Sequence, residues 1–497
     1  MPIDLLSQIK DQISTFARDV ERHLTPWTAA RDPVSFRQME HEVAAFGRQL
    51  ADHISGAVLQ QIVADPALQA RASQAARQHG RYRHGGRRQV DVTLLGGQSV
   101  RVPVEYLKVN RRRQRGRRRK NGRRGGGGTG LYPVLSVLGI CFGVTPALCG
   151  EVCRQVADSD SVRAGQAALA RRGIVLGHKQ TQAVVNKFST RAVEHRDTWV
   201  EQVNEQPAGP GPLWGKRVVV STDGGRLRER RPARHGRRRK ETGHRRYDAP
   251  WREPKLFTLY VIGKDGTVEA SYQPIYDGTL GDCNQLFTLL LGYLRALGVH
   301  QAEQLIFVGD GAPWIWERTA KVAHDLGLYP DQVVEVIDWC HAVSVLYQIV
   351  NARKTWAPGD PDRWIRRAKK WLYAGQVERL LAAIDALTVG RRARDIGEHR
   401  DYFARNSKRM QYQDFVAAKV PIGSGHVESA IRRVINMRMK SNGMFWLEVN
   451  AQGMLLLRSY LKAGHFDTLV DWSLCCAVPW WSMDGRPRAP FSFSGVS

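Results

Sequence analysis

The sequence predicts an α/β protein in which a mixed sheet with helices on its faces follows a largely helical amino-terminal part. Short apolar runs typical of buried strands occur at 217–220, 305–308 and 333–337, and helical patterns separate them. Helical spacing of apolar residues dominates 1–80. The chain has 497 residues, enough for several domains, and its net charge of +28 predicts a polyphosphate partner, DNA or RNA.

Composition excludes several other classes. With 42% apolar and 25% charged residues, the chain is neither wholly disordered nor a collagen-like fibre. Its 7 cysteines show no C-x-x-C or zinc-finger spacing, and their odd number fits a reducing cytosol. The first residues lack the pattern of a signal peptide. The uncharged stretch 125–150 contains Pro133, Pro146 and several glycines, so we expect a buried segment there rather than a membrane span.

The amino-terminal half divides into three predicted regions. Residues 1–80 form a helical region, which we interpret as an interaction or dimerisation bundle. Residues 81–142 hold a β-hairpin that turns at Gly96-Gly97, followed by an Arg-rich loop at 111–124 with ten Arg and Lys in fourteen positions.

Residues 143–200 form the third region, which resembles a helix-turn-helix. Helices are predicted over 145–156, before Gly173 and from His178 onward. The last of them carries side chains that can bond base edges or phosphates, so it is a candidate DNA-reading helix, and an ordinary helical linker is the alternative. The candidate DNA-binding residues on this helix are Lys179, Gln180, Gln182 and Lys187.

The carboxyl-terminal half is predicted to hold the α/β core. Its first part covers 214–352, a helical insertion covers 353–420, a late helical part of the core covers 421–470, and an irregular tail covers 471–497. Within the first part we expect a hairpin that pairs 256–262 with 267–273. A second basic run, 226–246, has eleven Arg and Lys in twenty-one positions and predicts contact with nucleic acid.

Three acids are distinguished by their positions. Asp223 and Asp310 each end an apolar strand beside glycines, where ligands of open α/β sheets bind. Glu428 lies in the first turn of a helix that begins after Gly423-Ser424-Gly425. Singly, a strand-end Asp is often a turn former and a first-turn Glu often complements the helix dipole. Together the three predict one catalytic centre.

The acids and their surroundings resemble the DDE transposases of bacterial insertion sequences, in particular the ISKra type. The resemblance covers roughly 80–470 and is most specific between Tyr402 and Arg458. Asp310 follows Asp223 by 87 residues, and Glu428 follows Asp310 by 118. The motifs that carry it are Thr222-Asp223-Gly224-Gly225, Gly309-Asp310-Gly311, Asn406, Arg409-Met410, Tyr412, Gly423-Ser424-Gly425 with Glu428, Arg438-Met439-Lys440, Gly443-Met444, Trp446 and Leu457-Arg458.

The resemblance implies a ribonuclease-H-like core and metal-dependent cleavage and strand transfer during DNA transposition. Asp223, Asp310 and Glu428 would be the catalytic and metal-binding residues for two Mg²⁺ or Mn²⁺ ions, which prefer carboxylate oxygens. The partners expected are the double-stranded DNA of element ends and target, and a second copy of the chain in a homodimer or higher oligomer. Neither a membrane nor a small-molecule cofactor is expected, and the location would be the cytoplasm, at the nucleoid.

Further residues have possible auxiliary roles. Asp338 and His341 resemble the D-x-x-H motif that often follows the second aspartate in such enzymes. His426 is a candidate for phosphate contact or proton transfer, and Trp446 for stacking on an extruded base; for both, a structural role is the alternative. The basic residues on or beyond the Glu428 helix that would hold the DNA backbone are Arg432, Arg433, Arg438 and Lys440.

Two other functions remain open at this point. A non-transposing ribonuclease-H-like nuclease or junction enzyme would use the same acids without joining DNA. A catalytically idle DNA-binding regulator would have no physical reason to keep charged residues at strand ends.

Overall fold

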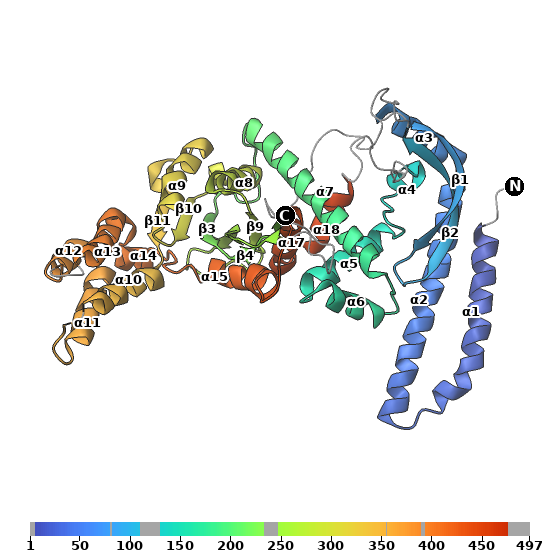
Figure 1. Ribbon diagram of the computed structural model, residues 1–497, viewed down its shortest axis with the longest axis horizontal. Helices are drawn as coiled ribbons and strands as arrows, with labels where there is room; N and C mark the ends of the chain where they lie inside the picture. The colour runs from blue at the N-terminus through green and yellow to red at the C-terminus, as the bar shows by residue number, and fades with distance from the viewer. Residues whose placement is uncertain are drawn as a thin grey trace. The chain divides into compact units, whose positions relative to one another are not determined.

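The computed structural model describes residues 5–79, 82–109, 130–232, 247–353, 355–388 and 393–475. The chain divides into two compact units (Figure 1): Met1–Arg191 with Asp467–Arg488, and Ala192–Phe466 with Ala489–Ser497. The Arg-rich run 111–124, residues 233–246 of the second run, and 476–497 of the tail lie outside the described residues. Among the described residues, no helix is both long and apolar enough to span a membrane.

The first unit consists of a helical part, a two-stranded hairpin and the three predicted helices that follow it. In chain order its elements are α1 (Leu5–Thr28), α2 (Pro33–Ala64), α3 (Pro66–His79), β1 (Tyr82–Thr93), β2 (Ser99–Val109), α4 (Pro133–Val137), α5 (Pro146–Asp158), α6 (Val162–Ala170), the first part of α7 (His178–Glu205), and α18 (Phe466–Cys475).

The β1–β2 hairpin forms as predicted. Val92 pairs with Val100 across the antiparallel strands, and both strands contribute to a core with Leu59 and Val63 of α2. The turn is held by a buried carboxylate, because both oxygens of Asp52 accept backbone N–H groups, those of residues 96 and 98, at 2.8 and 2.9 Å. The three helices predicted after residue 143 also form, as α5, α6 and α7, although α7 continues to Glu205.

The second unit contains the sheet and the helical insertion. Its remaining elements are β3 (Arg217–Gly224), β4 (Leu227–Arg228), β5 (Arg231–Pro232), β6 (Tyr247–Asp248), β7 (Trp251–Arg252), β8 (Lys255–Ile262), β9 (Ile275–Thr279), α8 (Cys283–Ala296), β10 (Gln304–Gly309), α9 (Pro313–Leu326), β11 (Val333–Ile337), α10 (Trp339–Ala352), α11 (Asp360–Tyr373), α12 (Val377–Asp385), α13 (Ala393–Asn406), α14 (Tyr412–Ala417), α15 (Gly425–Ile431), α16 (Met437–Met439) and α17 (Glu448–Ala463).

The main sheet is mixed, with strand order β11-β10-β3-β8-β9. Strands β11, β10 and β3 run parallel, whereas β8 is antiparallel to both β3 and β9. The predicted α/β class is therefore confirmed. The predicted partner of β8 was wrong: residues 267–273 form a loop with a single bridge from Ile262 to Val268, and β9 pairs with β8 instead. Burial explains the difference, since Ile275 is 1% exposed and Val268 is 43% exposed.

Side chains alternate between the two faces of this sheet, and different elements cover each face. Val219, Ile306 and Val308 share one face and pack with Val420 of the segment that precedes α15. The other face includes Phe257, whose ring meets the ring of Tyr293 on α8 at 5.4 Å. The helices α8 and α15 thus lie on opposite sides of the sheet (Figure 1).

A buried ion pair fixes β9 to the helices beside it. Arg196 and Asp277 are 3% and 0% exposed, and their side chains join at 2.9 Å. Tyr293 donates to the other carboxylate oxygen of Asp277 at 2.7 Å and contacts Tyr460 of α17 at 2.8 Å. Because every partner is satisfied, this polar cluster can lie in the core of the unit.

The predicted helical insertion forms α11 to α14, of which α11 and α13 pack with α10. Buried Trp364, Leu372, Leu380 and Phe403 lie on one face of their respective helices. Its end meets the sheet through Arg409, which bonds the Glu335 carboxylate of β11 at 2.6 Å. The insertion is therefore packed against the parallel edge of the sheet.

Candidate active site

Two of the predicted acids end neighbouring parallel strands. Val308 of β10 pairs with Ser221 of β3, so continuing this register by two residues brings Asp310 level with Asp223. Adjacent strands lie about 4.8 Å apart. Both carboxylates therefore occur at the same edge of the sheet, the edge formed by the carboxyl ends of the parallel strands.

The third acid comes from the helix that covers the same face. Asp223 has the same parity in β3 as Val219, so its side chain points to the face on which α15 packs. Asp310 continues the Ile306 and Val308 side of β10 to that face as well. Glu428 lies in the first turn of α15, which contacts β3 and β8. The structure thus brings Asp223, Asp310 and Glu428 into one neighbourhood.

The electrostatics of Asp223 reflect this convergence. Burial, followed by the nearby carboxylates of Asp310, Glu428 and Glu253, raises its pKa to about 6, against the lowering effect of a hydrogen bond from the Gly224 N–H. Its Oδ1 accepts that hydrogen bond at 2.6 Å. Ionising Asp223 is therefore costly unless a cation offsets the negative charge of its neighbours.

Sequence reasoning did not find Glu253, which follows β7. A Cβ atom on Gly224 would lie only 2.2 Å from Glu253 Oε1, so this carboxylate sits directly against the residue after Asp223. Lys255 Nζ is 4.0 Å from the other oxygen of Glu253. The register explains the proximity, since β8 pairs Leu256 with Asp223. Finding Glu253 from sequence would have required knowing that pairing.

The glycines beside the two aspartates are required by close packing. A Cβ on Gly225 would approach the Ile435 side chain to 2.7 Å, and a Cβ on Gly311 would lie 1.9 Å from the ring of Tyr402. The segment that follows Glu428 therefore packs closely against the turn after Asp223, and the helical insertion packs closely against the turn after Asp310. Tyr402 brings α13 close enough to Asp310 for that carboxylate to raise the pKa of the phenol further, after burial.

Asp338 holds the Gly-Ser-Gly turn to the sheet edge. It is 2% exposed and follows β11, and its two oxygens accept the backbone N–H groups of Ser424 and His341 at 2.6 and 2.5 Å. The Ser424 hydroxyl in turn lies 3.4 Å from Glu428 Oε1. Both Asp338 oxygens are thus occupied by protein donors, and this aspartate positions the helix that carries Glu428.

The other auxiliary candidates have distinct environments. His341 is exposed, 6.1 Å from the Tyr402 ring. His426 stacks on Tyr260 at 4.1 Å, and burial together with Arg433 lowers its pKa, which favours the neutral ring. Trp446 is half-buried and its Nε1 donates to the carbonyl of residue 439 at 3.0 Å, so this indole is fixed within the fold.

The four basic residues proposed to hold the DNA backbone divide into two kinds. Arg432 and Lys440 are exposed and available to a phosphate. Arg433 bonds the Tyr276 hydroxyl at 3.0 Å, and Arg438 is 5% exposed, with its guanidinium 5.2 Å from the Trp446 ring centre. The assignment of Arg438 to DNA binding is therefore wrong, because its guanidinium is buried against protein.

A buried arginine supports the Glu428 helix where it widens. Residues 432–436 form a π-helical turn, and Arg458 of α17 donates to the carbonyls of Arg433 and Val434, the latter at 2.6 Å. Such turns leave carbonyl groups without helical partners, which side chains can satisfy. Arg458 thus has a structural role beside the acids.

The candidate DNA-reading helix presents three of its four residues to solvent. Lys179, Gln182 and Lys187 are exposed on α7. Gln180 is half-buried, and its Nε2 donates to the Phe142 carbonyl at 2.9 Å. One of the two N–H donors of the Gln180 amide is thus used to hold the preceding loop.

The chemistry of the acids suits a divalent cation, although they do not form a closed ligand set. The carboxylates around Asp223 raise its pKa, and grouped carboxylates are the donors that Mg²⁺ and Mn²⁺ take. Across the described parts of the chain, however, no three His, Cys, Asp or Glu side chains lie close enough together to hold a metal ion as they stand. The carboxylates thus match the donor type and charge that these cations require. Their side chains are neighbours, but they are not as close together as the ligands of a bound ion.

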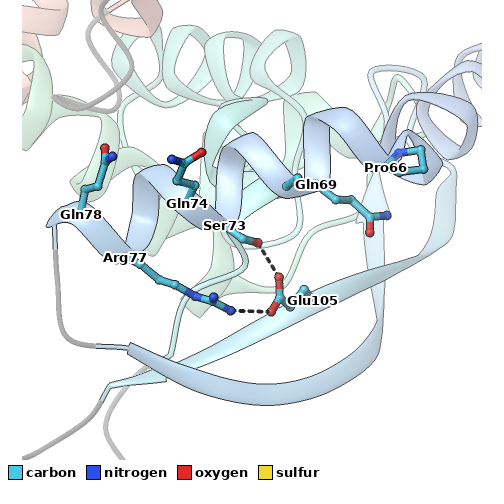
Figure 2. Close-up of a pocket in the computed structure, with 8 residues that line it drawn as sticks. Pro66, Gln69, Ser73, Gln74, Arg77, Gln78 and Glu105 are labelled. Carbon is cyan, nitrogen blue, oxygen red and sulfur yellow. Dashed lines mark hydrogen bonds and ion pairs between the residues drawn. The ribbon is translucent and has the colours of Figure 1, made fainter.

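A groove of 760 Å³ in the first unit contains none of these acids. It lies between α3 and β2, and Figure 2 shows Ser73 and Arg77 pointing toward Glu105 and Gln74 and Gln78 pointing away from it. Glu105 accepts from Ser73 and pairs with Arg77 at 3.6 Å. Its charge is thus balanced within the protein, and the groove serves as a polar seam between helix and hairpin.

Comparison with known proteins adds no assignment. No protein-family model, no curated protein and no solved structure matches the chain. The function must therefore be argued from the geometry of the acids and from the resemblance of their motifs.

Proposed function

We propose that the protein is a DDE transposase that binds the ends of an insertion sequence and carries out metal-dependent DNA cleavage and strand transfer. The observation that carries this proposal is the convergence of Asp223, Asp310 and Glu428 from β3, β10 and α15 at one sheet edge. The strand order supports a ribonuclease-H-like core, in which the first acid is on the first strand, the second ends the fourth and the third lies on a late helix.

In this proposal the three carboxylates hold the cation or cations, and the surrounding residues maintain their arrangement. Bound Mg²⁺ or Mn²⁺ supplies activation of the attacking oxygen and stabilisation of the leaving oxygen. Asp338 and Ser424 orient the helix of Glu428, and Arg458 supports its widened turn. Since the Asp223 pKa is about 6, the carboxylate is mostly ionised at neutral pH and available to a cation.

Contacts with DNA would come from both units. The exposed Arg432 and Lys440 lie on the chain segment that follows Glu428, where they would hold backbone phosphates. Lys179, Gln182 and Lys187 of α7 would contact the element ends, since amide and ammonium groups bond base edges and phosphates. We further propose a homodimer or higher oligomer that acts on paired ends at the nucleoid.

The test uses the full chain and duplexes that span the DNA bordering its gene. Asp310→Asn and Glu428→Gln should each abolish cleavage in Mg²⁺ and leave DNA affinity within about twofold, because they remove charge without removing volume. Ca²⁺ should support binding without cleavage, since its flexible coordination positions the attacking oxygen poorly. Glu317→Gln is the matched control, because its exposed carboxylate lies on α9. Cleavage within tenfold of wild type in both variants would reject the assignment.

Joining distinguishes the transposase from its alternatives. A transposase should link the 3′-hydroxyl of a cut end to target DNA, whereas a nuclease or junction enzyme should cut without joining. A catalytically idle regulator should bind the ends and cut nothing in either Mg²⁺ or Mn²⁺.

A further inference from the structure

The described residues between β3 and β8, which are 225–232 and 247–254, form two short strand pairs beside the acids, and we call these pairs the ribbon. Here β4 pairs with β7 and β5 with β6, both antiparallel. The ribbon is anchored on residue 446 by two backbone hydrogen bonds, from Arg230 N to Trp446 O at 2.7 Å and from Trp446 N to Arg228 O at 2.9 Å. The strand segment 227–230 is thereby hydrogen-bonded to β7 on one edge and to residue 446 on the other.

Alternation along this strand separates a buried side from an exposed one. Leu227 and Glu229 are 0% and 4% exposed, whereas Arg228 and Arg230 face solvent. The buried Glu229 carboxylate pairs with the neighbouring Arg231 and with an arginine of β7, at 2.7 and 3.1 Å. Within the described residues, Arg228 and Arg230 form no ion pair, so their charges are available to a ligand.

The two exposed arginines and three aromatic rings form a continuous ladder in the order Trp251, Arg228, Phe445, Tyr247, Arg230. Arg228 lies 4.9 Å from the ring centre of Trp251 and 5.9 Å from that of Phe445. The Phe445 ring meets the Tyr247 ring at 5.4 Å, and Arg230 lies 4.5 Å from Tyr247. Trp251 and Tyr247 are 53% and 41% exposed, so both residues of this arginine–aromatic ladder are accessible to solvent.

Trp251 of the ladder and Glu253 both line a groove of 680 Å³, to which Asp223, Asp310 and Glu428 do not contribute. Glu253 lies against Gly224, next to Asp223. The ladder strand itself begins at Leu227, four residues after Asp223. A strand of nucleic acid that crosses the acids could therefore continue onto the ladder.

We propose that the arginine–aromatic ladder binds unpaired nucleotides of the DNA strand adjacent to the cleaved phosphate. The proposal rests on the proposed function, since it names the form of DNA which that site holds. Arginines alone would serve duplex phosphates, but exposed ring faces can stack only on bases that are not already stacked in a helix. The indole nitrogen of Trp446 is hydrogen-bonded inside the protein, so we assign base stacking to Trp251 and Tyr247.

The experiment measures binding of the full chain to a fluorescent single-stranded oligonucleotide and to its duplex, in EDTA. The variant combining Trp251→Ala and Tyr247→Ala should weaken single-strand binding by about tenfold or more and change duplex binding by less than twofold. The matched control combines Trp214→Ala and Tyr329→Ala, whose rings are 67% and 72% exposed but lie outside the ladder. Trp251→Phe with Tyr247→Phe should retain binding, because both rings remain.

A second measurement tests the contact directly. Single-stranded DNA containing 5-bromodeoxyuridine should cross-link under ultraviolet light to residues 247–251 of the wild-type protein. Equal losses on single-stranded and duplex DNA would instead assign the ladder to duplex binding, and an unchanged affinity together with absent cross-links would overturn the proposal.

Failure of the ladder and failure of the proposed function give different results. Binding in EDTA requires no cleavage, so the ladder can fail while the wild type still cuts and joins DNA. If the wild type never cuts but the ladder variant still loses single-strand affinity selectively, the ladder stands and the transposase assignment falls.

Discussion

Replacing Asp223 with Asn should make the fold more stable while it abolishes cleavage. The Asp223 pKa is raised from 3.8 to about 6, first by burial and then by Asp310, Glu428 and Glu253. In the unfolded chain the carboxyl releases its proton near its usual pKa, but in the folded protein it resists doing so. The wild type therefore loses stability as the pH rises from about 4 to about 6, and the loss is complete above that window.

The size of the effect follows from the shift. A difference of about two pKa units corresponds to about 3 kcal/mol in the free energy of unfolding above pH 6. The neutral Asn side chain has no such dependence, so Asp223→Asn should gain up to about 3 kcal/mol at pH 8 and little at pH 4. For a unit of this size the gain should raise the melting temperature by on the order of 5 °C.

The assay compares urea unfolding of Asp223→Asn and wild type at pH 4 and pH 8, with Asp331→Asn, an exposed carboxylate, as control. Added Mg²⁺ should stabilise the wild type and not the variant, because ligand binding to the folded state alone adds stability. A variant no more stable than wild type at pH 8, or equally stabilised at both pH values, would refute this account of the carboxylates.

Four further outcomes are expected. Asp338→Ala should lower single-turnover cleavage by on the order of ten- to a hundred-fold with DNA affinity retained, since it frees the turn before Glu428; an unchanged rate would argue against a positioning role. Gln182→Ala should cost about 1–3 kcal/mol of end-specific binding in gel-shift titrations but leave random DNA unaffected. Asp277→Ala should lower the free energy of unfolding by about 3–5 kcal/mol in denaturant titrations, because it removes the buried carboxylate partner of Arg196 and leaves only the exposed Asp197. Replacing the arginines of 226–246 with Gln should flatten the log–log salt dependence of DNA binding by roughly 3 units, and an unchanged slope would mean that this run does not contact phosphates.

Local patterns were sufficient for the elements but not for all their partners. Apolar runs at β3 and β10 are buried and the run at β11 is half-buried, and the sequences of all three alone predicted strands correctly. The partner of β8 was misassigned because 267–273 and 275–279 both resemble strands, and only packing selects the second. Gln180 and Arg438 likewise look like polar surface residues in the sequence. In the structure, the Gln180 amide donates a hydrogen bond to the Phe142 carbonyl, and Arg438 is buried.

The sequence by itself determined the α/β class, the hairpin, the helical insertion and the identity of three acids at strand or helix ends, because these depend on periodicity and on glycines next to charges. Only the tertiary structure decided that Glu253 joins those acids, that Asp338 serves backbone N–H groups, and that Trp251 and Tyr247 rather than Trp446 expose their rings. The physical reason is that burial and hydrogen-bond partners come from residues distant in the chain. Glu253 reaches Asp223 across a strand pairing, and Asp338 reaches Ser424 across 86 residues of sequence.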